Sequence, residues 1–551
     1  EREKKEMSQS DSAGSLLTTI DFLSLNVSPF AIALKSGVEM RDMWSKLPFP
    51  LEFKIYLFNV TNPADIANGE KPIVEEIGPY FYDEWKEKVN LVDRDEDDTV
   101  EYNQRITWHF NASRSNGLTG DEELVFPHLA ILGMMMITVS EKPTMVGVAA
   151  KAVDSIYKKP SSVFVRATAK EIMFDGLPVD CSVKDFAGSA VFDSTGRKKN
   201  VLKSVAEYSR LTFLFLIQKN GTISAEKMRV YRGYKNPKDV GRVLEWKNES
   251  ALTIWAGDEC NAFNGTDSTI FHPFLYQDED VVSFSSDICR SLSARFQHPT
   301  EVQGRIRTNR YSADFGDQSS VPEEKCFCPT PETCLKKGAM DLYKCVGTPV
   351  VATLPHFYLA DPSYLETVSG LHPVKDHEIS IDFEPMTGTP LIARKRLQFN
   401  MFIMPIEKFK LMKNFPNALL PLFWVEEGVE LGDDIIKNSA SVTIKNFRRC
   451  VKWTMVFLGL GLGSAAGFLE YKRRQLTDKL EVTPIPAGGT IRTTISAGKN
   501  GDEKKWPPNI STLQAAALQQ FSSTYFYTIF EIFIYKLSLE IFVYNILHIR
   551  N

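Results

Sequence analysis

The stretch "KCFCPTPETCLKKGAMDLYKC", residues 325–345, holds four of the eight cysteines of the chain. With two cysteines upstream it forms one cluster: Cys260, Cys289, Cys326, Cys328, Cys334 and Cys345. Zinc sites favour paired Cys-x2–4-Cys or His-x3–5-His spacings, whereas this stretch contains prolines and no histidine. We therefore interpret the cluster as a disulfide framework rather than a metal site. Six cysteines allow 15 pairings, so their spacing leaves the connectivity open.

Glycosylation triplets, like disulfide bonds, are typical of proteins that pass through the secretory pathway. Five lie within residues 45–440, with acceptors Asn59, Asn111, Asn220, Asn248 and Asn264. Such triplets mark surface positions of secreted chains, and disulfides persist in oxidising compartments. The two patterns together predict an extracellular or lumenal domain whose cysteines are oxidised.

The bulk composition is that of a globular protein with a substantial core. Of the 551 residues, 43% are hydrophobic and 24% are charged. The formal net charge is only −5, which gives no indication of a nucleic-acid partner.

An uncharged run, "WTMVFLGLGLGSAAGFL" (453–469), predicts a transmembrane helix over residues 451–469. Basic residues lie on both sides of it, so the positive-inside rule does not fix its orientation. The glycosylation triplets place the preceding residues outside the cell. We therefore expect an ectodomain over residues 38–450 and a cytosolic tail over residues 470–551.

Both ends of the sequence are atypical. Residues 1–37 begin with a polar run, and the apolar segment 16–34 carries Asp21, which is costly near the centre of a membrane span. The last residues, 521–551, are apolar but interrupted by Glu531, Lys536 and Glu540. Their residue types have AT-rich codons, so translated non-coding sequence is one interpretation of this end.

Alternating apolar and polar residues predict β-strands at 51–60, 101–110, 396–404 and 441–447. Helical periodicity is clearer at 144–159 and 164–174. The expected fold is a strand-dominated α+β domain with a helical insert around residues 125–215.

Several long phrases then occur in a recognisable order: "WSKLPFPLEFKIYLFNVTNP" (44–63), "EEIGPYFYDEWKEK" (75–88), "NGTDSTIFHPF" (264–274), "FSSDICRS" (284–291), "CFCP" (326–329), "GAMDLYKC" (338–345), "LPHFYLADP" (354–362) and "RKRLQFNMFIMP" (394–405). Over about residues 38–470 the chain resembles the class B scavenger receptor family, and most closely its insect sensory neuron branch. The resemblance implies an antiparallel β-barrel-like ectodomain with a helical apical bundle, an internal hydrophobic tunnel and two membrane anchors. The first of these anchors is not recognisable in residues 1–37.

The resemblance also implies roles for individual residues. Carried over by cysteine order, it pairs Cys260 with Cys326, Cys289 with Cys345, and Cys328 with Cys334. The segment "YKKPSSVF" (157–164) matches the basic apical segment of the family. Lys158, with Lys159 beside it, then corresponds to the lysine that captures lipid head groups. Two solvated surface lysines before a proline turn are the alternative interpretation.

The function that the resemblance implies is non-enzymatic delivery of hydrophobic odorants, such as pheromones and fatty-acid-derived lipids, with no cofactor. It implies a plasma-membrane location on an olfactory dendrite or cilium, with an odorant-binding protein and an odorant receptor complex as partners. General lipid or lipoprotein uptake in another tissue is the alternative. An enzyme receives little support, because no Gly-x-Ser-x-Gly or His-Glu-x-x-His motif is present and the histidines are scattered in sequence.

Overall fold

The computed structural model describes residues 33–178, 210–211, 220–303, 306–330, 333–432 and 440–477. Close contacts divide the chain into two units, the first ending at Lys452 and the second beginning at Trp453. The predictions for residues 1–32 and 478–551 lie outside the described residues.

The first unit is built on one large antiparallel sheet. Within the described residues it has thirteen strands, eleven of them in the order β10-β11-β12-β15-β16-β17-β1-β2-β3-β8-β9. The strands are β1 (Leu51–Val60), β2 (Val74–Arg94), β3 (Thr99–Phe110), β8 (Ile223–Tyr231), β9 (Val243–Trp246), β10 (Val281–Ser285), β11 (Arg290–Val302), β12 (Ile306–Ala313), β13 (Met340–Asp341), β14 (Val351–Thr353), β15 (Ile379–Glu384), β16 (Thr389–Ile403) and β17 (Ala418–Glu430). The strands predicted at 51–60 and 101–110 are confirmed, and most of 396–404 lies in β16.

The two ends of this strand order are joined by a short segment around Thr266. Thr266 pairs with Arg242 beside β9 and with Ser283 of β10. The Thr266 amide donates to the Val282 carbonyl at 3.1 Å, and the Thr266 carbonyl accepts from the Phe284 amide at 2.8 Å. The sheet thereby becomes a nearly closed barrel, and the predicted α+β barrel-like class is confirmed.

The two faces of the sheet differ in chemistry. Residues paired directly across neighbouring strands share a face, and successive residues alternate between faces. The inner face carries buried core side chains such as Phe53, Ile55, Tyr102 and Leu397. On the opposite, outer face, Lys54 and Arg396 both form ion pairs with Glu426.

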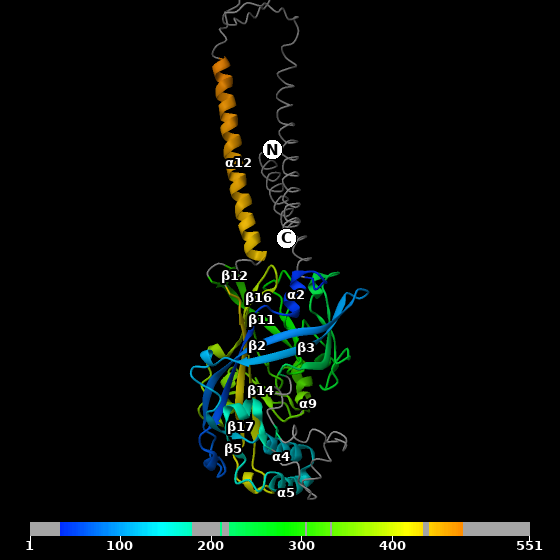
Figure 1. Cartoon of the computed structure of the whole chain (residues 1–551), viewed down its shortest axis with the longest axis vertical. Coiled ribbons are helices and arrows are strands. Elements are labelled where there is room, and N and C mark those ends of the chain that lie inside the picture. Colours follow the sequence, from blue (N-terminus) through cyan, green and yellow to red (C-terminus); the bar gives the residue numbers. More distant parts are fainter. Residues whose placement is uncertain are drawn as a thin grey trace, which may run out of the picture. The chain divides into compact units, whose positions relative to one another are not determined.

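A small hairpin and two helices form one end of the first unit. The hairpin pairs β4 (Glu123–Pro127) with β5 (Phe164–Thr168), and between these strands the chain forms α4 (Leu129–Glu141) and α5 (Val146–Ile156). Figure 1 shows these helices at the end of the barrel unit opposite α2 (Glu39–Ser45). The helix predicted at 144–159 is confirmed.

The helix predicted at 164–174 is wrong for its first half. Residues 164–168 form β5, and a helical turn follows only at η3 (Glu171–Asp175). The β-branched Val165 and Thr168 suit an extended chain, and pairing with β4 satisfies their backbone groups. Local periodicity was therefore overridden by a strand partner about forty residues upstream.

The last described element is the long helix α12 (Ala440–Thr477). The strand predicted at 441–447 is wrong, because these residues form the first turns of α12. Seven alternating residues are too few to distinguish a strand from a helix that continues into an apolar run. Residues Val451–Lys472 of α12 are long and apolar enough to cross a membrane.

The remaining short elements connect the strands. They are α3 (Pro63–Ile66), η1 (Ala112–Arg114), η2 (Pro143–Met145), β6 (Leu177–Pro178), β7 (Arg210–Leu211), η5 (Pro237–Asp239), α8 (Asp258–Asn261), η6 (Pro322–Phe327), α9 (Tyr343–Val346), η7 (Pro355–Phe357), α10 (Pro362–Glu366), η8 (Lys375–His377) and η9 (Lys410–Met412).

Candidate functional site

The two lysines singled out from sequence lie in the turn between α5 and β5. Lys158 and Lys159 are both exposed, and both have left-handed backbone, with φ of 55° and 57°. The Lys159 amide donates to the Asp154 carbonyl at 2.7 Å, which fastens this turn to the end of α5. Two consecutive non-glycine residues in this conformation store strain of about 1–3 kcal/mol each. The turn therefore presents two cations at the helical end of the first unit.

A buried histidine lies beneath this turn. His128 precedes α4, and the ring of Tyr157 packs edge-on against it with centroids 4.6 Å apart. Burial lowers the pKa of His128 to about 4, so the ring is neutral at pH 7. Its Nδ1 is buried and has no hydrogen-bond partner among the described residues. The turn thus combines two exposed cations with a neutral, incompletely paired imidazole.

Helix α4 supplies the apolar surface beside this turn. Ile131, Leu132 and Met135 are buried in the core, while Met136 and Ile137 remain partly exposed. One side of the helix therefore serves packing, and the part-exposed side stays a candidate lining for an apolar ligand.

The cysteine cluster is oxidised in the structure. Three disulfide bonds join Cys260 to Cys326, Cys289 to Cys345, and Cys328 to Cys334, the same pairs that the family resemblance implies. The first two cross-link segments 66 and 56 residues apart, whereas the third spans only six.

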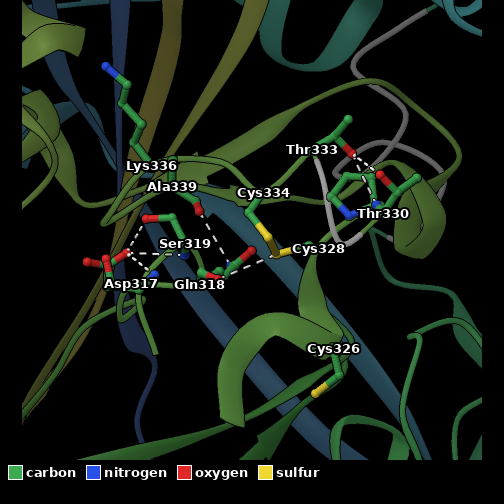
Figure 2. The surroundings of a disulfide bond; sticks show 12 residues. Asp317, Gln318, Ser319, Cys326, Cys328, Thr330, Thr333, Cys334, Lys336 and Ala339 are labelled. Atoms are coloured by element: carbon green, nitrogen blue, oxygen red, sulfur yellow. Dashed lines mark hydrogen bonds between the residues drawn. A yellow bond between two sulfur atoms is a disulfide. The ribbon is translucent and has the colours of Figure 1, made fainter. Parts of the chain in front are cut away.

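The third disulfide fixes a local loop. Figure 2 shows the Cys328–Cys334 bond between the loop of Asp317, Gln318 and Ser319 and the Thr330–Thr333 turn. Ser319 Oγ donates to Asp317 Oδ1 at 2.6 Å, and Gln318 Nε2 donates to the Ala339 carbonyl at 3.4 Å. This part of the cluster is a cross-linked loop whose Cys328 and Gln318 are buried.

The five predicted glycan acceptors differ in their surroundings. Asn248 and Asn264 are exposed, the former at the tip of a turn. Asn220 is exposed, but its carboxamide pairs with the Trp108 backbone. Asn111 is half-buried and donates to Asp83 at 3.0 Å. Asn59 is half-buried in β1, and its Oδ1 accepts from the Val125 amide at 2.9 Å.

A polar pocket lies on the outer face, and sequence pattern did not reveal it, because its histidines are far from Glu76 along the chain. The pocket encloses about 420 Å³. It is lined by Val74, Glu75, Glu76, His356, Gly370, His372, Val374 and His377. Three of the histidines that seemed scattered in sequence therefore meet in the fold.

Hydrogen bonds fix the protonation pattern in this pocket. His356 Nδ1 accepts from the His372 amide at 3.0 Å, so its proton is on Nε2 and is donated to Glu76 at 2.6 Å. Burial acts to raise the pKa of Glu76, but the hydrogen bonds from His356 and Trp424 outweigh it and lower that pKa. Burial beside His356 lowers the pKa of His377 to about 4. No group of three or more His, Cys, Asp or Glu side chains in the described part of the chain is arranged to hold a metal ion.

The region that matches known proteins includes nearly all of the first unit and most of the apolar helix. A model described as "CD36 family" matches residues 13–469. Sensory neuron membrane protein 1 of Apis mellifera is 53% identical over 494 residues, which is 88% of this chain and 92% of that protein. The protein of the same name from Manduca sexta is 42% identical over 78% of this chain and 82% of its own length. That of Pediculus humanus subsp. corporis is 40% identical over 82% and 87%.

Proposed function

Since the chain belongs to the CD36 family, we propose that it is a non-enzymatic membrane receptor that delivers hydrophobic odorants to olfactory receptors. The ligands are pheromones and related fatty-acid-derived lipids, which pass through a tunnel inside the barrel. Residues 38–450 form the extracellular domain and residues 451–469 the transmembrane helix.

One observation carries this proposal, namely the apolar inner face of a nearly closed sheet. A long alkyl chain in such a barrel stays out of water, and each buried methylene stabilises the complex by about 0.8 kcal/mol. A longer alkyl chain is therefore held more tightly by the inner face.

The names of the relatives support the sensory assignment. The three relatives described above are all named sensory neuron membrane protein 1 and come from insects. They support our proposal that this chain lies in the plasma membrane of an olfactory dendrite or cilium. Its partners there are an odorant-binding protein, which brings the lipid, and an odorant receptor complex, which receives it.

The exposed lysine turn supports entry at the helical end of the barrel. Lys158 and Lys159 present two cations there, and a polar lipid head group meets them before the chain enters the apolar interior. The part-exposed side of α4 provides apolar surface close to this turn.

The test is lipid binding by the purified full-length protein in nanodiscs, using a fluorescent long-chain lipid and competitors of decreasing chain length. We expect saturable binding that weakens as the competitor is shortened. Lys158→Ala reduces the on-rate for a carboxylate probe, whereas the matched variant Lys151→Ala, an exposed lysine within α5, leaves it unchanged.

Two results separate the parts of the proposal. Lipid passage is overturned if the affinity does not depend on the length of the competitor's alkyl chain, or if the folded protein does not bind the lipid. Equal behaviour of the two lysine variants leaves lipid passage intact and returns Lys158 to an ordinary surface role.

A further inference from the structure

Four charged side chains lie on the inner face of the sheet, among the apolar core residues. Glu84 and Lys86 are two residues apart on β2, and Glu84 is paired with Leu51 across β1. On the next strands Phe53 is paired with Glu427, and Glu427 with Lys395. Paired and alternate residues share a face, so these four side chains occupy one patch of the interior.

With Asp287 these residues form an inner charge cluster: Glu84, Lys86, Asp287, Lys395 and Glu427. Lys86 Nζ lies 2.6 Å from Glu427 Oε2 and 3.6 Å from Glu84 Oε2. Lys395 Nζ lies 3.3 Å from Asp287 Oδ2. Each lysine therefore already has a carboxylate partner at ion-pair distance.

Glu84 is the incompletely paired member of this cluster. Its Oε1 accepts from Trp108 Nε1 at 3.0 Å, but its Oε2 is buried and has no hydrogen-bond partner in the described part of the chain. The side chain of Glu84 is 2% exposed, whereas those of Lys86 and Glu427 are 19% and 26% exposed. The cluster thus runs from the buried Glu84, through the partly exposed Lys86 and Glu427, to Lys395 and Asp287, whose side chains are 36% and 60% exposed.

The protonation states leave the cluster without net charge. Burial raises the pKa of Glu84 to about 8, so this carboxyl group is neutral at pH 7. Burial acts to lower the pKa of Lys86, but the carboxylates around it, Glu427 first, raise it above its usual value. The two lysine cations are then balanced by the two remaining carboxylates, Glu427 and Asp287.

We propose that the inner charge cluster is a head-group filter, which admits lipids with an uncharged oxygen head group and excludes fatty-acid carboxylates. Aldehydes, alcohols and esters are the admitted class. The proposal deepens the lipid-passage function proposed above and rests on it.

The filter follows from two features of the inner charge cluster: its balanced charges and the hydroxyl of the protonated Glu84, which can donate a hydrogen bond. A carboxylate ligand brings a negative charge to a site whose lysines are already neutralised, and an uncompensated charge beside the buried Glu84 end of the cluster is disfavoured. A carbonyl or hydroxyl oxygen adds no charge. It accepts a hydrogen bond from the protonated Glu84, whose Oε2 lies 3.6 Å from Lys86 Nζ but has no hydrogen-bond partner among the described residues.

The experiment uses full-length protein in nanodiscs, a fluorescent alkyl probe, and four competitors with the same sixteen-carbon chain: hexadecanal, hexadecanol, hexadecyl acetate and hexadecanoate. At pH 7 we expect the three neutral lipids to compete at concentrations about ten-fold or more below that of the acid. Glu427→Gln removes the carboxylate paired with Lys86 and leaves an unbalanced cation. We expect it to strengthen hexadecanoate binding about ten-fold and to leave the neutral lipids unchanged.

The matched control is Glu426→Gln, one residue away on the same strand. Glu426 is also ion-paired and is the more buried of the two, with 6% of its side chain exposed against 26% for Glu427, but it is on the outer face with Lys54 and Arg396. We expect this variant to retain the wild-type ranking of competitors. Loss of a buried ion pair by itself therefore cannot account for a change seen only in Glu427→Gln.

Equal competition by acid and neutral lipids in the wild type overturns the filter while lipid passage stands. The same conclusion follows if both glutamine variants shift the ranking alike. Absence of chain-length-dependent binding overturns lipid passage and the filter with it. The wild-type ranking needs no variant, so the proposal can still be refuted if Glu427→Gln does not fold.

Discussion

The Trp44 indole N–H donates a 3.2 Å hydrogen bond to Asp267, a residue 223 positions further along the chain. The same carboxylate oxygen accepts from the Tyr102 hydroxyl at 2.9 Å and lies 4.0 Å from Lys88 Nζ. Asp267 follows Thr266, through which the barrel closes. One carboxylate therefore ties α2, β3 and the closing segment together.

Asp267→Ala should lower the free energy of unfolding by about 3–5 kcal/mol, because it leaves Lys88 buried without its nearest anion. Chemical denaturation of the full-length protein measures this change. Asp280→Ala, which removes an exposed partner of Arg295, should cost no more than about 1 kcal/mol. Equal losses in the two variants would show that Asp267 has no special part in closure.

Gly265→Ala should destabilise the protein by about 3 kcal/mol or more. A Cβ at this position meets the Val282 carbonyl oxygen at 1.9 Å, and the backbone φ is +80°. Gly147→Ala in α5 is the control, since its Cβ meets nothing within 4 Å and alanine favours a helix. The expected thermal shifts have opposite signs, and a stable Gly265→Ala variant would contradict the closure described for Thr266.

Loss of the Cys289–Cys345 disulfide should cost about 4 kcal/mol, and loss of Cys328–Cys334 about 2 kcal/mol. The loops closed by these bonds span 56 and 6 residues, and a longer loop removes more entropy from the unfolded chain. Paired Cys→Ser variants compared by urea unfolding give both values. The reverse order would mean that the short loop of Figure 2 matters through its folded contacts instead.

Acid should destabilise the protein through His128. Its pKa is lowered from 6.5 to about 4 by burial, so between these values the unfolded chain binds a proton that the folded chain does not. Stability is therefore lost as pH falls through this window, by about 2 kcal/mol at pH 5. His128→Gln should remove this part of the pH dependence, and His109→Gln, at an exposed position on β3, should retain it.

Glycan occupancy should follow exposure at two of the five acceptors. Asn248→Gln and Asn264→Gln should each remove one endoglycosidase-sensitive mass increment, because both side chains are exposed. Asn509 lies in a further triplet, Asn509-Ile510-Ser511, and Asn509→Gln should leave the mass unchanged, since residues 470–551 are predicted to be cytosolic. Mass spectrometry of intact protein measures all three, and a glycan on Asn509 would reverse the proposed topology.

Local sequence pattern correctly predicted elements that pack on the core along one face over their whole length. The alternation at 51–60 coincides with β1, because one face of that strand packs on the core along its length. The segments 164–174 and 441–447 were assigned wrongly, since a distant strand partner decides the first and a long apolar continuation decides the second.

The candidate sites were less predictable than the strands. Lys158 and the cysteine pairs came from resemblance to a family, and their spacing alone did not specify them. Glu76 and His356 are 280 residues apart, so only the register of the sheet brings them together. Charged residues such as Lys86 and Glu427 have the sequence pattern of a solvated strand edge, yet the barrel turns them inward.

The closing segment contains a glycosylation triplet, Asn264-Gly265-Thr266, and this overlap has a consequence for biogenesis. In the closed barrel Thr266 is 7% exposed and engaged in the sheet on both sides, so a transferase cannot read the triplet there. Any sugar on Asn264 must be attached while the nascent chain is still open. The overlap of the triplet with the closing segment thus sets an order for maturation, in which attachment of a sugar to Asn264 has to precede closure of the barrel at Thr266.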